Sequence, residues 1–264
     1  IIGYGKLGGI EMSYASDLDV VFLHEIDEKA DTDGERAVSG MKFASRLIQK
    51  ILTYLTTQTR DGRAYEIDMR LRPSGNAGVM VVSSHAFEVY QHDKAWAWEH
   101  QALVRARAIA GDVRVMASFD KIRTDILTKP YDKAKVRTDV IEMRQKMQTH
   151  LGTKEGGTAE HQFHLKQDFG GLVDIEFLAQ YVVLAFAHDY PNLATWSDNV
   201  RIFKEVAKTG LWSVERCEKL TQSYLNLRKK THELALMEQK TIVQDDTWQE
   251  TREFVRGVWD GVLN

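Results

Sequence analysis

The segment from Tyr65 to Arg72 constrains the fold more than any other, because its apolar and charged residues alternate without a break. Such alternation places one set on each face of a β-strand, so the strand needs a core on one side and water on the other. The apolar set is Tyr65, Ile67, Met69 and Leu71, and the charged set is Glu66, Asp68, Arg70 and Arg72. The segment therefore predicts a sheet that carries Asp68 on its charged face.

Shorter patterns predict the elements around this strand. Residues 1–4 and 20–23 are apolar runs rich in β-formers, and residues 79–82 have the pattern of a return strand. Between residues 41 and 55 the apolar side chains recur every three or four positions. This spacing predicts an amphipathic helix with one face packed on the sheet.

The pattern changes after Gly111 to long helical segments joined by short polar breaks. We therefore predict an α+β protein with a sheet-containing domain over residues 1–111, followed by an all-α helical bundle domain over residues 112–264. In the helical part we expect Ser197 and Ser213 as N-caps, Gly210 as a helix end, and a bundle seam of Leu220, Tyr224, Leu227, Thr231 and Leu234.

Composition limits the class of protein. The 264 residues are 43% hydrophobic and 28% charged, and no apolar run is long enough to span a bilayer, so we expect no membrane segment. A single cysteine, Cys217, allows no intrachain disulfide and fits the reducing cytoplasm. The net charge of -3 argues against a general nucleic-acid binder. The abrupt start at Ile1, without an initiator Met, has the character of a piece of a longer polypeptide whose first elements are missing.

Asp17 and Asp19 form the first candidate site. They are two residues apart at the entrance to the apolar run 20–23, so on a strand both carboxylates project from the same face. Paired carboxylates of this kind hold Mg²⁺ in phosphoryl-transfer enzymes. By itself, this spacing more often marks a polar strand entrance.

Two neighbouring features favour the catalytic interpretation. Upstream, the glycines of the segment 6–9 predict a turn whose backbone N–H groups approach phosphate closely, although a tight connection between two elements gives the same pattern. Downstream, Asp68 offers a third carboxylate and a general base. Arg70 and Arg72 beside it can neutralise phosphate, the alternative being a solvated strand face with ion pairs. Together these features indicate a two-metal phosphoryl-transfer site.

The order of these motifs resembles the catalytic signature of the DNA polymerase β-like nucleotidyltransferase superfamily. Within it, longer blocks resemble glutamine synthetase adenylyltransferase. These blocks are GYGKLGG at 3–9, SDLD at 16–19, EIDMRLRPSG at 66–75, WEHQALVRAR at 98–107 and GGLVDIEF at 170–177. The resemblance extends over essentially the whole chain and implies a nucleotidyltransferase core followed by a helical companion domain.

The family is bifunctional, with two homologous nucleotidyltransferase domains in one polypeptide. One copy attaches AMP from ATP to a tyrosine of glutamine synthetase, and the other removes it by phosphorolysis. The chain resembles the C-terminal, adenylylating copy, chiefly through GYGK at 3–6, FLH at 22–24, TDG at 32–34 and WEHQ at 98–101. The resemblance further implies Mg²⁺ as cofactor and control by glutamine and the PII signalling protein. The alternatives are the deadenylylating copy, a nucleic-acid nucleotidyltransferase of the same superfamily, and a non-catalytic regulatory module.

The resemblance also implies roles for individual residues. The metal-binding and catalytic residues are Asp17, Asp19 and Asp68, and the nucleotide-binding residues are Lys6, Gly8, Gly9, Ser16, Arg70 and Arg72. Secondary candidates are Glu99, Arg105, Arg107, Asp174 and Glu176.

Each secondary candidate has a structural alternative. Glu99, Arg105 and Arg107 fit a solvated helix face with ion pairs, although Arg105 is also a candidate for a phosphate or fold-organising contact. Asp174 and Glu176 face the catalytic cleft according to the resemblance, or are acids in the first turn of a helix. We expect structural or surface roles for the neighbouring histidines, His161 and His164.

Overall fold

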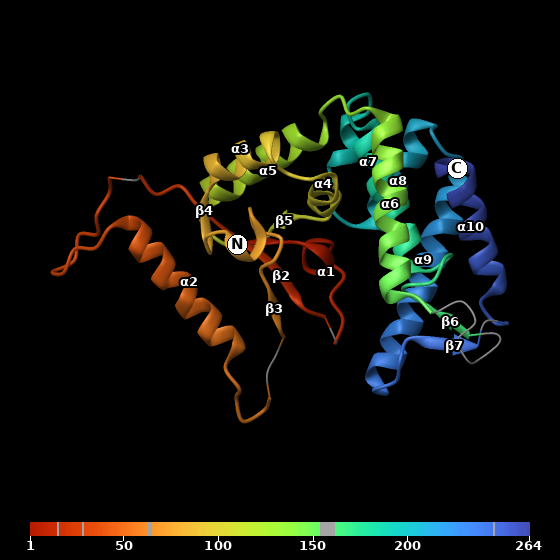
Figure 1. The fold of residues 1–264 in the computed structure, drawn as a ribbon, viewed down its shortest axis with the longest axis horizontal. Helices are drawn as coiled ribbons and strands as arrows, with labels where there is room; N and C mark the ends of the chain where they lie inside the picture. The colour runs from red at the N-terminus through yellow and green to blue at the C-terminus, as the bar shows by residue number, and fades with distance from the viewer. Residues whose placement is uncertain (15, 28, 63–64, 154–161, 245) are drawn as a thin grey trace. The chain divides into compact units, whose positions relative to one another are not determined.

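The chain forms two compact units, residues 1–126 and 127–264, in a computed structural model (Figure 1). The structure describes all residues except 15, 28, 63–64, 154–161 and 245. The first unit combines a mixed sheet with helices, and the second is predominantly helical. The predicted α+β class is therefore confirmed.

The first unit is built around strand β2. Its elements are β1 (Ile2–Gly3), α1 (Gly5–Gly8), β2 (Leu18–His24), α2 (Gly40–Thr56), β3 (Ile67–Asp68), η1 (Gly75–Ala77), β4 (Val81–Ser83), α3 (Ser84–Asp93), α4 (Ala97–Val104), β5 (Arg107–Ala108) and α5 (Val113–Leu127). β1 pairs antiparallel with both β2 and β5, whereas β3 and β4 pair parallel with successive parts of β2. The strand order is β3-β2-β1-β5.

The alternating segment forms a shorter strand than predicted. Only Ile67 and Asp68 belong to β3, because the Asp68 carboxylate accepts a hydrogen bond from the backbone N–H of Arg70 at 2.8 Å. This bond turns the chain, and a further turn follows in which the Arg72 N–H donates to the Met69 carbonyl at 3.2 Å. The predicted return strand is also different, since β4 runs parallel to β2.

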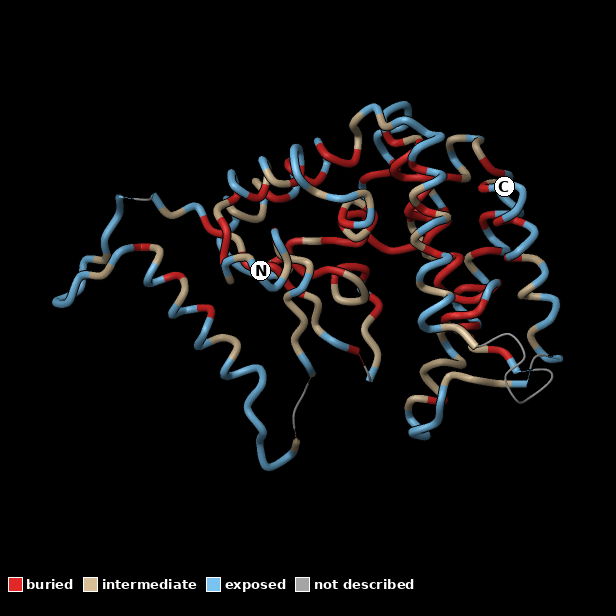
Figure 2. Tube along the Cα trace, in the orientation of Figure 1, coloured by how far each residue is buried: buried red, intermediate tan, exposed pale blue. Residues whose placement is uncertain are grey.

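Helix α2 confirms the amphipathic prediction. Ser39 caps its N-terminus by accepting a hydrogen bond from the Lys42 N–H. Its buried side chains, Ala44 and Ile48, pack in one core cluster with Val20, Phe22 and Val81 of the sheet. The remainder of the helix surface is exposed or half-buried, as Figure 2 shows along its length.

The first unit extends beyond the boundary expected at residue 111. Helix α5 belongs to it because Phe119 is fully buried, with its ring 6.0 Å from that of Phe87 in α3. The buried Arg123 guanidinium also donates to the carbonyl oxygens of Leu103 and Val104 at the end of α4. An ordinary amphipathic helix thus completes the sheet-containing unit rather than opening the helical one.

The second unit surrounds a helix that is buried on almost all sides. Its elements are α6 (Lys133–Leu151), β6 (Gln162–His164), α7 (Leu172–Phe186), η2 (Pro191–Ala194), α8 (Asn199–Thr209), α9 (Val214–Leu236), β7 (Ile242–Gln244) and α10 (Gln249–Leu263). Helices α6, α8, α9 and α10 all contact α7, whose residues from Leu172 to Ala185 are buried except Glu176. Within the described residues, no helix combines the length and apolar character that a membrane span requires.

The helix-end signals are largely confirmed. Ser213 caps α9 through the Arg216 N–H, and Gly210 ends α8 with φ +75°. The expected cap at Ser197 is wrong, since Asp198 takes that place and accepts from the Arg201 N–H at 2.9 Å. The predicted seam lies on α9, where Leu220, Tyr224, Leu227 and Leu234 are buried and Thr231 is half-buried.

Replacing Phe119 with Ala tests the assignment of α5 to the first unit. The change leaves a cavity in a fully buried site, so we expect unfolding free energy to fall by about 3–5 kcal/mol. Urea unfolding followed by circular dichroism measures it. Val113→Ala, at a position 76% exposed on the same helix, is the control and should have an effect of at most about 0.5 kcal/mol. Equal effects of the two substitutions would contradict the assignment.

Candidate active site

The sheet brings two of the three predicted carboxylates together. Asp19 of β2 and Asp68 of β3 are register partners on adjacent parallel strands. Register partners of this kind project from the same face, about 4.8 Å apart along the hydrogen-bonding direction. Asp17 lies one residue before β2 and is exposed, so it extends the acidic edge without being part of the strand.

Arg70 supplies positive charge to this acidic edge. Its Nε donates to Asp68 Oδ2 at 2.7 Å, and a second guanidinium nitrogen makes an ion pair with the same oxygen. The hydrogen bond from Arg70 lowers the pKa of Asp68. The pKa of Arg70 is raised, first by its hydrogen bond to Asp68 and further by the charges of Asp19 and Asp17. All three carboxylates therefore act on one guanidinium.

These donors fit a hard divalent cation. Mg²⁺ prefers a few carboxylate oxygens, and Asp19 and Asp68 present theirs from adjacent strands. Among the described residues, however, no three His, Cys, Asp or Glu side chains converge as a complete metal cluster. Asp68 is turned toward Arg70 instead, so metal binding would require this ion pair to open.

Gly5 makes room for the Asp19 carboxylate, a role that the sequence interpretation missed. Its φ of +52° lies in the left-handed region, and an added Cβ would lie 2.5 Å from Asp19 Oδ2. The backbone also fixes this contact, because the Tyr4 N–H donates to the Asp19 carbonyl at 2.8 Å. The signal in the sequence is the glycine itself, which directly precedes the segment 6–9.

Gly8 and Gly9 have a packing role in this structure. Their N–H groups donate to the carbonyls of Tyr4 and Gly5 at 2.9 and 3.0 Å, which already satisfies both donors. A Cβ on Gly8 would overlap the carbonyl oxygens of Gly3 and Arg105. These contacts are those of a tight connection between β1 and the chain that follows α1. In this structure the two N–H groups do not face an open site where a phosphate could bind.

A buried ion pair lies beneath this turn. Arg105 and Glu11 are bonded to each other, with side chains only 5% and 4% exposed. Arg107 donates from Nε to the Gly8 carbonyl at 3.2 Å. The expected solvated helix face is wrong for both arginines, because Arg105 follows the last residue of α4 and Arg107 lies in β5. The burial of Glu11 cannot be predicted from the sequence, because its partner Arg105 is far along the chain.

The other candidates of this unit make local contacts. Glu99 is buried and accepts hydrogen bonds from the Tyr90 hydroxyl and the Trp96 N–H, both at 2.9 Å, so it too is not on a solvated face. Ser16 is buried and accepts from the Ser13 N–H. Arg72 donates to carbonyls of Met69, Asn76 and Gly78 and so ties the turn after Asp68, while Lys6 is half-buried in α1.

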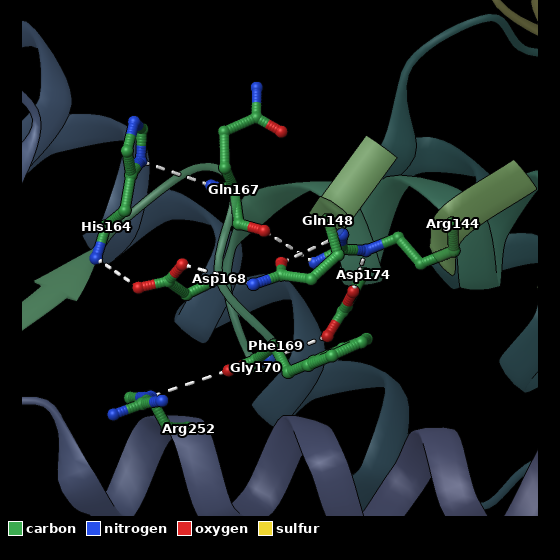
Figure 3. Close-up of polar contacts among 9 residues, drawn as sticks. All are labelled: Arg144, Gln148, His164, Gln167, Asp168, Phe169, Gly170, Asp174 and Arg252. Carbon is green, nitrogen blue, oxygen red and sulfur yellow. Dashed lines mark hydrogen bonds and ion pairs between the residues drawn. The ribbon is translucent and has the colours of Figure 1, made fainter. Parts of the chain in front are cut away.

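In the second unit, Asp174 forms an ion pair with Arg144 in which neither side chain is exposed (Figure 3). Asp174 also accepts from the Gly170 N–H at 2.6 Å, as an acid in the first turn of α7. Burial raises the pKa of Asp174, against the opposing charge of Arg144. Asp174 is therefore placed as a buried structural acid in the first turn of α7. Glu176 is half-buried and accepts from the Tyr224 hydroxyl at 3.3 Å.

Asp168 is a second buried acid that the sequence interpretation missed. It accepts hydrogen bonds from the Thr153 N–H, the Thr153 hydroxyl and the His164 N–H, each at 2.8 Å. Burial alone would raise the pKa of Asp168, but these bonds outweigh it and lower the pKa. His164 has the expected structural role, since its Nδ1 accepts from the Gln167 N–H (Figure 3). His161 lies outside the described residues.

Comparison with known proteins gives the family. The model described as glutamate-ammonia ligase adenylyltransferase matches residues 1–122. A curated relative from Acinetobacter baylyi, named bifunctional glutamine synthetase adenylyltransferase/adenylyl-removing enzyme, is 52% identical over all of this chain. The chain belongs to the glutamine synthetase adenylyltransferase family. A relative with the same name from Hahella chejuensis is 49% identical, again over the whole chain.

The family comparison also shows how much of the relatives this chain represents. It spans 29% of the length of the Acinetobacter protein and 27% of the Hahella protein. Within the helical unit of this adenylyltransferase-family chain, residues 141–246 match a second model, described as GlnD PII-uridylyltransferase. Both units therefore have counterparts among nucleotidyl-transferring families.

Breaking the buried ion pair tests the support beneath α1. Arg105→Gln leaves the Glu11 carboxylate buried without its partner, so we expect a loss of about 3–5 kcal/mol in unfolding free energy, measured by urea unfolding. The double variant Arg105→Met/Glu11→Leu removes both charges and should recover part of this loss. If the single and double variants were equally destabilised, the pairing would not be the cause.

Asp168 gives a pH prediction. Its pKa is lower in the folded chain than in the unfolded chain, so its contribution to stability is present above about pH 4 and is lost as the pH falls through the folded pKa. Thermal unfolding between pH 3 and pH 7 should therefore be less pH-dependent in Asp168→Asn than in the parent. Asp139→Asn, a half-buried acid on α6, is the control. Identical pH profiles of parent and Asp168→Asn would refute this role.

Proposed function

We propose that this chain is a Mg²⁺-dependent adenylyltransferase that moves AMP from ATP to a tyrosine hydroxyl of glutamine synthetase. The observation that carries the proposal is the register pairing of Asp19 with Asp68, in a chain 52% identical to a protein named for this activity. Asp17 supports it, since its charge also acts on Arg70. The reaction and its substrates are proposals for the chain, which spans under a third of that relative's length.

The chemistry follows from the charges at the sheet edge. Bound Mg²⁺ would neutralise the triphosphate and polarise the α-phosphate. Asp17, Asp19 and Asp68 would supply the oxygens that hold it. The tyrosine oxygen forms the new bond to the α-phosphorus as the bond to pyrophosphate breaks, and Asp68 is the carboxylate proposed to accept the hydroxyl proton. An aspartate is ionised at neutral pH, so Asp68 is able to accept this proton.

The proposed nucleotide-binding residues fall into two groups: those that can contact phosphate directly and those that hold the surrounding loops in place. The Arg70 side chain is 74% exposed and can exchange its bond to Asp68 for one to a phosphate oxygen. Lys6 lies on α1 beside the same strand edge. Ser16, Gly8, Gly9 and Arg72 contribute to the nucleotide site by fixing the loops around it, given the contacts that they already make.

From the resemblance of the motifs we also propose effectors and a cellular location for this activity. Glutamine and the PII protein are the proposed effectors, and the match of residues 141–246 to a family described by its action on PII supports the second. The proposed location is the cytoplasm. Nucleic acid is not a proposed partner, since the net charge is -3.

Asp19→Asn tests the proposal. We expect transfer of label from α-labelled ATP to glutamine synthetase to fall on the order of 100-fold or more, because the substitution removes a charge that acts in the transition state. Removal of Mg²⁺ with a chelator should have the same effect. Asp125→Asn, an exposed acid on α5, is the matched control and should retain full transfer.

The same assay separates the alternatives. Release of ADP from adenylylated glutamine synthetase on addition of phosphate, without forward transfer, would assign the adenylyl-removing activity that the relatives' names include. Transfer to RNA alone would assign a nucleic-acid enzyme. Metal-dependent ATP binding without transfer in either direction would leave a regulatory module. Undiminished forward transfer in Asp19→Asn would refute the proposed site.

A further inference from the structure

The outward face of α2 is apolar where a solvent-facing helix is normally polar. Phe43 is 49% exposed, Leu47 is 45% exposed and Tyr54 is 81% exposed. At 100° per residue these three side chains lie within about 40° of one another around the helix axis. The core contacts of the helix come from its other side, at Ala44 and Ile48. Phe43, Leu47 and Tyr54 are therefore not part of this core cluster.

A row of cations runs beside this apolar stripe. Lys42, Arg46 and Lys50 are exposed and spaced four residues apart, so they line one side of the helix. Helix α2 contains no Asp or Glu along its whole length. Among the described residues, none of these three side chains has an ion-pair or hydrogen-bond partner. Other exposed cations of the chain, such as Arg70 and Arg114, do have a carboxylate partner.

The position of α2 connects this surface to the active site. The helix is the link between β2, which carries Asp19, and β3, which carries Asp68 (Figure 1). It contacts β3 and β4 through its inner side, and among the described residues its outer side is exposed at Phe43, Leu47 and Tyr54. Figure 2 shows the exposed residues continuing along the helix from end to end.

The charges and apolar side chains on the outer side of α2 indicate which kind of molecule binds there. Three unpaired cations beside Phe43, Leu47 and Tyr54 complement a protein segment that combines carboxylates with apolar side chains. Phe, Tyr and Arg are residue types enriched at protein interfaces, and Tyr and Arg are enriched at their hot spots. Nucleic acid fits less well, because Leu47 in the centre offers no surface for base stacking and the chain is acidic overall.

We propose that the α2 surface, defined as Lys42, Phe43, Arg46, Leu47, Lys50 and Tyr54, docks the protein acceptor through an acidic, apolar segment of that acceptor. This inference rests on the proposed function. A transferase with a protein substrate gains affinity from contacts remote from the reacting hydroxyl, and the α2 surface supplies such contacts beside the catalytic strands.

Charge reversal at the cations tests the inference in the full chain. For Lys42→Glu/Arg46→Glu/Lys50→Glu we expect the KM for glutamine synthetase to rise at least 10-fold, with kcat at saturating acceptor and the affinity for a fluorescent ATP analogue retained. Acceptor affinity of the parent should also weaken with added salt, whereas that of the variant should not. Phe43→Ser/Tyr54→Ser, which leaves the charges in place, should raise the KM by a similar factor.

The matched control carries the same change in charge on another helix. Lys135→Glu/Arg137→Glu/Lys146→Glu reverses three exposed cations of α6 and should change the KM less than 2-fold. Circular dichroism confirms that each variant is folded. If the folded α2 variants had an unchanged KM, the docking inference would be overturned. Label transfer by the parent chain would still support the proposed function. Absence of transfer by the parent would refute the proposed function itself. Loss of RNA binding in the α2 variants, with no change in KM, would overturn the inference in favour of nucleic acid.

Discussion

The pairing of Asp19 with Asp68 across two parallel strands is the constraint on which the proposed active site depends. Like charges at register positions repel each other, so this arrangement needs positive charge close by. Arg70 provides this positive charge. It donates a hydrogen bond to Asp68 and interacts electrostatically with Asp19 and Asp17. Arg70 thus offsets the repulsion between the acids at this sheet edge.

The support behind α1 includes a chain of close polar contacts. Gly8 packs against the Arg105 carbonyl, the Arg105 side chain is paired with Glu11, and Arg107 binds the Gly8 carbonyl. Arg105 and Glu11 are charged and removed from water, so each depends on the other being present. The short helix α1 is consequently held in place by groups that lie about a hundred residues away in sequence.

The sequence predicted those features that follow from local periodicity. The three-and-four spacing identified α2, and strict alternation identified the polar face that carries Asp68. The length of β3 could not be predicted in this way, because the Asp68 side chain bonds to the Arg70 N–H and ends the strand. The burial of Arg105 could not be predicted either, since its partner Glu11 is distant along the chain. Where a side chain finds a non-local polar partner, periodicity alone gives the wrong environment.

The left-handed conformation of Gly5 limits how the site can vary. Its φ of +52° is one that residues with a side chain rarely adopt, and the space where a methyl group would lie is occupied by the Asp19 carboxylate. Even alanine, the smallest chiral residue, would have to displace that oxygen. The handedness of the backbone at position 5 and the place of the Asp19 carboxylate oxygen are therefore one geometric fact, and no residue with a side chain can take the place of this glycine without moving that oxygen.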